Sequence, residues 1–131
     1  MQLKDLVREW LQKAKQDLSS AKFLSDMKPL PKDIIGFHCQ QAVEKCMKAF
    51  LVLHNIEPPR SHDLLFLKTK CQSMGGLTEI DDTILIRLNP YSVEHRYPGE
   101  IVVAESDVLS DLENTGILVE DLLGQIEGRL K

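Results

Sequence analysis

The segment from Tyr91 to Gly99 carries the side chains best suited to chemistry, because two tyrosines, a histidine, an arginine and a glutamate lie close together there. Arginine can hold a phosphate or carboxylate through two parallel hydrogen bonds, and tyrosine rings can stack on a nucleobase. We therefore expect Tyr91, Arg96 and Tyr97 to bind an anionic ligand that contains a base. In the alternative interpretation, the tyrosines fill one end of a helical bundle and Arg96 caps a helix or pairs with an acidic residue.

A second polar group interrupts the most apolar part of the chain. The run from Gln40 to Lys45 carries two amides, a glutamate and a lysine in a predicted central helix, and we expect Glu44, Lys45 and Lys48 on the outer face of that helix. These side chains face either a ligand or partner, or simply solvent. The residues expected to meet a ligand here are Gln41, Lys45 and Lys48, together with Arg60 and His62 from the connector that follows.

The cysteines and histidines do not form a recognisable metal site. Cys39, Cys46 and Cys71 lie in apolar stretches without a C-x-x-C spacing, which argues against structural zinc and disulfides and favours a reducing cytoplasm. His38, Cys46 and His54 are spaced so that neighbours point about 80° apart around a helix. We therefore expect no metal and no other cofactor, and no catalytic cysteine.

Apolar residues recur at three- and four-residue steps along most of the chain, which predicts amphipathic helices. Proline pairs or glycine pairs separate the predicted segments, and Ser61 is a candidate N-cap for the third. Because only one short run, Ile101 to Val103, could be extended, a sheet is excluded. The sequence thus predicts a single all-α domain over residues 1–131, an up-down bundle of four to five helices. The expected helices are 3–27, 32–54, 62–73, 78–88 and 107–130.

Composition and charge argue against some classes of function. The chain has 131 residues, 43% hydrophobic and 27% charged, with a net charge of −4. Residues 28–70 carry seven basic and four acidic side chains, whereas residues 71–131 carry four basic and twelve acidic ones. An acidic protein is not expected to bind duplex DNA, although its basic middle segment could hold a smaller anion. No secretory leader or membrane span is expected, and we predict a cytoplasmic protein.

Three motifs in this order resemble the HEPN family, the higher eukaryotes and prokaryotes nucleotide-binding domain. Residues 37–49 (FHCQQAVEKCMKA) are similar to its signature helix, and residues 58–64 (PPRSHDL) to its P-x-(S/T)-H-D-L segment. Residues 91–99 (YSVEHRYPG) are similar to its Y-x-x-x-R-Y-P segment. The resemblance implies a bundle of four or five helices that commonly forms a homodimer and acts beside a minimal nucleotidyltransferase, as in a toxin–antitoxin pair.

The resemblance also implies candidate catalytic residues. Some HEPN domains are metal-independent RNases that use an arginine, four to six intervening residues, and a histidine at a dimer cleft. Here Arg87 and His95 are the candidates, but seven residues separate them and Pro90 interrupts the segment. His95-Arg96-Tyr97 also resembles the His-x-Tyr of members whose tyrosine is adenylylated by the partner transferase.

The leading functional prediction is a nucleotide-binding accessory module that acts with a nucleotidyltransferase. Arg60, Arg96 and Lys45 would neutralise phosphates, Tyr91 or Tyr97 would stack a base, and Gln41 would donate a hydrogen bond. One alternative is a metal-independent RNase toxin that uses Arg87 and His95 on RNA. The other is a protein-interaction module without catalysis or nucleotide affinity.

Overall fold

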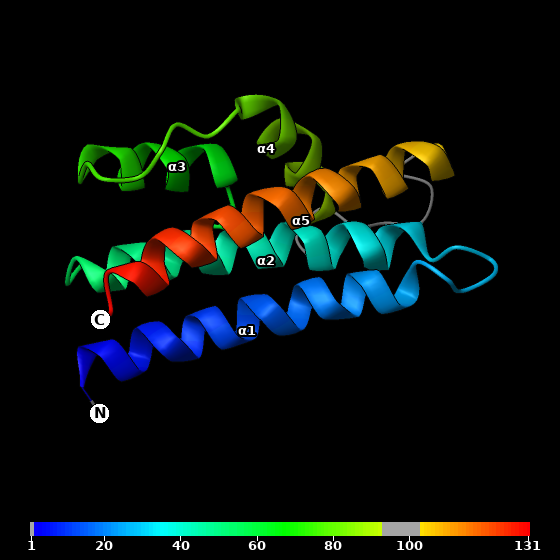
Figure 1. The fold of residues 1–131 in the computed structure, drawn as a ribbon. Helices are drawn as coiled ribbons and strands as arrows, with labels where there is room; N and C mark the ends of the chain where they lie inside the picture. The colour runs from blue at the N-terminus through cyan, green and yellow to red at the C-terminus, as the bar shows by residue number, and fades with distance from the viewer. Residues whose placement is uncertain (1, 93–102) are drawn as a thin grey trace.

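The computed structural model describes residues 2–92 and 103–131, and these form an up-down arrangement of helices (Figure 1). The elements are α1 (Leu3–Leu24), α2 (Lys32–Leu53), α3 (Leu64–Ser73), α4 (Asp82–Leu88), the 3-10 turn η1 (Asn89–Tyr91) and α5 (Glu105–Gly128). No strand occurs within the described residues. The all-α fold class predicted from the sequence is therefore confirmed.

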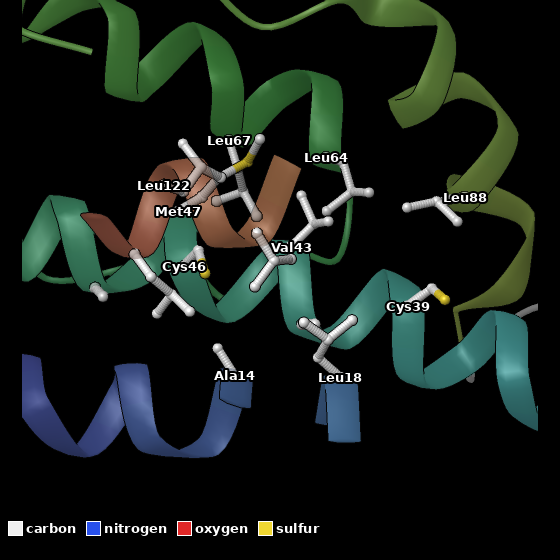
Figure 2. Packing of buried hydrophobic residues seen from close by; sticks show 14 of the residues in the cluster. Ala14, Leu18, Cys39, Val43, Cys46, Met47, Leu64, Leu67, Leu88 and Leu122 are labelled. Atoms are coloured by element: carbon white, nitrogen blue, oxygen red, sulfur yellow. The ribbon is translucent and has the colours of Figure 1, made fainter. Parts of the chain in front are cut away.

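Helix α2 is the centre of the fold, because α1, α3, α4, η1 and α5 all contact it. Fifteen of its 22 residues are buried, so its burial extends well beyond a single stripe. Figure 2 shows the result, with side chains of α2 meeting those of α1, α3, α4 and α5 in one apolar core. The labelled members of this cluster are Ala14, Leu18, Cys39, Val43, Cys46, Met47, Leu64, Leu67, Leu88 and Leu122.

Helices α1 and α2 run antiparallel and pack along their full length (Figure 1). The apolar side of α1 repeats every three or four residues, as a helix that buries one face requires. Asp17 lies within this packed interface at 8% exposure, where it accepts a hydrogen bond from Lys45 Nζ at 2.5 Å. Its other oxygen lies 2.8 Å from His38 Nδ1. A buried carboxylate with two polar partners fixes how the two helices align.

Several predicted helix boundaries are wrong by a few residues. Helix α1 ends at Leu24 rather than residue 27, and α4 begins at Asp82 rather than residue 78. Helix α3 begins at Leu64, and its N-cap is Asp63 instead of Ser61, because the Asp63 carboxylate accepts from the amides of residues 65 and 66. The last helix spans Glu105–Gly128 instead of residues 107–130.

Candidate functional site

The polar run of α2 is buried, which corrects the expectation that it lies on an outer face. Glu44 is 3% exposed and Lys48 is 7% exposed. The reason is that the segment leading into α3 covers this side of α2, as the hydrogen bond from Gln40 Nε2 to the His62 carbonyl shows (2.9 Å). At these positions α2 therefore faces other parts of the chain instead of solvent.

These buried groups form one connected hydrogen-bond network. Gln41 Nε2 donates to Gln40 Oε1 at 2.7 Å, and Gln40 Nε2 donates to Glu44 Oε1 at 3.1 Å. Glu44 Oε2 accepts from Lys48 Nζ at 3.0 Å, and Glu44 Oε1 lies 2.8 Å from His62 Nδ1. Spacings of four residues place Gln40, Glu44 and Lys48 on the same side of α2. The network therefore holds both the backbone and the imidazole of His62 against α2.

A polar cleft of about 460 Å³ lies where the segment before α3 meets η1. Its size falls within the range of small-molecule sites in proteins. The side chains that line it include one cation, one imidazole, one amide, one carboxylate and two hydroxyls. Among the described residues, the lining consists of Arg60, Ser61, His62, Asp63, Asn89, Pro90 and Ser92.

The first amides of α3 are already bonded within the protein. Leu64 N donates to Asn89 Oδ1 at 2.9 Å, and Leu65 N donates to Asp63 Oδ1 at 3.0 Å. Asn89 Nδ2 in turn donates to Asp63 Oδ1 at 3.1 Å, which ties η1 to the start of α3. A helix N-terminus often binds anions through such amides, but here an anion must be held by side chains instead. Arg60, which is exposed at the cleft, supplies the permanent positive charge.

The structure brings together two of the predicted ligand-binding residues, Arg60 and His62, in this cleft. Gln41 and Lys48 do not line it, because both bond to neighbours in the network behind it. Lys45 is bonded to Asp17 on the α1 side of α2. Gln41 and Lys48 thus act on the cleft only through the network that holds His62, whereas Lys45 aligns α1 with α2.

Tyr91 lies inside the fold rather than at its surface. The residue is 2% exposed, and its ring packs directly against the backbone of Gly36 in α2. Burial raises the pKa of its hydroxyl to about 12. The ring as placed offers no free face to a nucleobase, so this position fits the alternative interpretation, in which tyrosine fills the end of the bundle.

Arg87, a candidate catalytic residue, is held by a buried carboxylate. Its Nε donates to Asp111 Oδ1 at 2.5 Å and its Nη2 donates to Oδ2 at 3.1 Å. This paired hydrogen bonding with Asp111 raises the pKa of Arg87 above its usual range. The other residues of the predicted site, His95, Arg96 and Tyr97, lie outside the described residues, so their predicted roles stay predictions.

The sequence did not predict the buried network behind the cleft. Glu44 was expected on an outer face, and Gln40 in a run that meets either a ligand or solvent, although their spacing of four places them side by side on a helix. Asn89 was not among the predicted site residues, yet its amide joins η1 to α3. Its position directly before Pro90 was the available signal, because asparagine before proline favours a turn in which the side chain bonds to nearby backbone.

The three cysteines are buried and poorly ionised. Desolvation raises the pKa of each thiol, Cys39, Cys46 and Cys71, from 9.0 to about 12. A thiolate is the reactive form of cysteine, so these side chains are inert in the folded protein.

Because the pKa of each buried thiol is raised, we expect the protein to lose stability in alkaline solution. Well below pH 9 the thiols are protonated in both the folded and unfolded chain, so their contribution is constant. Between pH 9 and 12 only the unfolded chain releases these protons, and the free energy of unfolding should fall by up to about 1.4 kcal/mol per pH unit for each thiol. Urea unfolding under reducing conditions measures this slope. Cys46→Ala should show a shallower slope, and an unchanged slope would contradict the assignment.

The described residues offer neither a metal site nor a membrane-spanning helix. They contain no group of three histidine, cysteine or acidic side chains arranged to hold a metal ion. No helix among them is long and apolar enough to cross a membrane.

Comparison with known proteins identifies the family. The HEPN domain profile matches residues 7–125, which is most of the chain. The crystal structure of ST0689, described as an archaeal HEPN homologue, is similar in fold with a TM-score of 0.61 and 24% sequence identity. That alignment covers 95% of this chain and 98% of the archaeal one. No curated protein matches significantly. The chain belongs to the HEPN domain family.

Proposed function

We propose that this HEPN chain is a nucleotide-binding accessory module that holds a nucleotide phosphate in the cleft between the start of α3 and η1. The observation that carries the proposal is that Arg60 and His62 line one cleft together with Asn89 and two serines. A guanidinium binds phosphate oxygens in a planar, two-bond arrangement, and hydroxyl and amide groups suit the remaining oxygens of a nucleotide. Catalysis is not part of the proposal.

We also infer that the chain acts with protein partners. A minimal nucleotidyltransferase, as accompanies many HEPN domains, would be the functional partner in a toxin–antitoxin-like pair. A homodimer would place two copies of the basic segment 28–70 in one assembly and so strengthen its attraction for anions. Co-purification with a transferase encoded beside this chain tests the proposed partner. Sedimentation of the chain alone tests the proposed homodimer.

The nucleotide-binding statement is tested by isothermal titration with ATP. Arg60→Ala should weaken binding at least tenfold, because a charge-assisted hydrogen bond of about 1.5–3 kcal/mol is lost. Arg60 is exposed, so the substitution should leave the fold intact. Adenosine, which lacks phosphate, should bind more weakly than ATP and should not respond to Arg60→Ala.

The matched control is Lys13→Ala, which removes one exposed positive charge from α1, away from the cleft. Equal losses of ATP affinity in Arg60→Ala and Lys13→Ala would mean that only the net charge of the protein matters, and the cleft would not be the binding site.

The RNase alternative is tested by incubating the same protein with total RNA and a metal chelator. If the wild-type protein cleaves RNA and His95→Ala does not, the chain is a nuclease and not a nucleotide-binding accessory module.

A further inference from the structure

The solvent side of α5 exposes apolar residues between two hollows. Ile117 is 64% exposed and Leu109 is 40% exposed, although both lie on a helix whose opposite side is buried. Ile117 lines a hollow of about 520 Å³ toward α4 and another of about 350 Å³ toward the end of α1. A projecting side chain flanked by two depressions is the surface that an approaching helix meets when side chains interlock.

The rims of these hollows are strongly acidic. Three carboxylates border the hollow toward α4 and two border the one toward α1. The two cations in the linings are already partnered, since Arg87 is bonded to Asp111 and Lys22 lies 3.7 Å from Glu120. The five carboxylates are Glu79, Asp81, Glu113, Glu120 and Asp121. The surface therefore combines an apolar centre with a net negative border.

Two glycines on α5 lie where the fold of this chain would also accept a larger residue. A Cβ at Gly116 would meet only Lys22 Cε, at an ordinary contact distance of 3.9 Å, and a Cβ at Gly124 would meet nothing within 4 Å. The fold of this chain thus does not require glycine at either place, although each glycine costs about 0.5–1 kcal/mol of stability inside a helix. Gly124 is exposed and leaves room for another backbone to approach α5 closely, whereas Gly116 is buried within the chain.

We propose that this face of α5 is a docking surface for a basic amphipathic helix of a partner protein. Charge complementarity identifies the occupant, because lysine or arginine side chains would meet the acidic border while apolar ones enter the hollows beside Ile117. A second copy of the same face would bring carboxylates against carboxylates. Nucleic acids and anionic membranes are repelled for the same reason. The surface does not include the nucleotide cleft, so either proposal can fail without the other.

The test uses a labelled 18-residue leucine–lysine helix as the probe and fluorescence anisotropy as the readout. The wild-type protein should bind it, and Ile117→Gln should weaken binding at least tenfold. The matched control is Phe23→Gln, because Phe23 is an 83% exposed apolar residue on α1. This variant should bind as the wild type does. A leucine–glutamate helix of the same length should not bind.

Three outcomes would overturn the proposal. Absence of binding to the wild type would show that the face does not accept a basic helix. Equal affinity in Ile117→Gln and the wild type would show charge attraction without docking at this face. Sedimentation that detects a dimer in the wild type and a monomer in Ile117→Gln would assign the face to a second copy of the chain instead.

Discussion

Gly36→Ala should lower the free energy of unfolding by about 3 kcal/mol, among the largest effects of any single methyl group in this protein. A Cβ at Gly36 would overlap three atoms of the Tyr91 ring. The ring is 2% exposed, so it cannot move aside without disturbing the core, and such overpacking costs about 1–3 kcal/mol or more. Urea unfolding followed by circular dichroism measures the change.

The control for this prediction is Gly124→Ala, which makes the same chemical change in open space on α5. Here the better helix propensity of alanine should raise stability by about 0.5–1 kcal/mol. In Gly36→Ala, replacing Tyr91 with leucine should recover part of the loss, because the clashing ring is gone. Equal midpoints for the two alanine variants would show that Tyr91 does not pack on Gly36.

Glu44→Leu should cost about 3–5 kcal/mol, because it leaves the buried ammonium of Lys48 without its carboxylate. The variant should also weaken nucleotide binding, since His62 loses the Glu44 carboxylate that helps to orient its imidazole at the cleft. The urea midpoint measures the first effect and isothermal titration with ATP measures the second.

A double variant separates charge from packing in this network. Glu44→Leu combined with Lys48→Met removes both buried charges and fills the space with apolar groups, which in other proteins is often neutral for stability. Most of the lost stability should therefore return, while nucleotide binding should stay weak. If the double variant were as unstable as Glu44→Leu alone, the unpaired charge of Lys48 would not be the cause of the lost stability.

The helices were predictable because apolar periodicity is a local property of the sequence. The α1 pattern, with one buried face, gave the helix directly, and only its end was misplaced. The start of α3 was harder to predict, because Ser61 and Asp63 are both good N-cap residues. The choice between them depends on Asn89, which lies in a different part of the chain and accepts a hydrogen bond from Leu64 N.

The site was only partly predictable, since its geometry depends on contacts between distant segments. Arg60 and His62 were identified by residue type and by their place before a helix, where functional groups gather. The buried position of Glu44 was missed because periodicity assumes that a helix has one exposed face, whereas α2 is covered on nearly all sides. The burial of Tyr91 depends on Gly36, and no local pattern near residue 91 reports that contact.

A titration of ¹⁵N-labelled protein with ATP, followed by amide chemical shifts, tests most directly whether the cleft binds a nucleotide. We expect the largest shifts at residues 60–63 and at Asn89 and Ser92, which line the cleft. Shifts concentrated instead at the groove of Arg8, Lys15 and Lys131, between α1 and the end of the chain, would contradict this expectation. So would the absence of any saturable shift at the cleft.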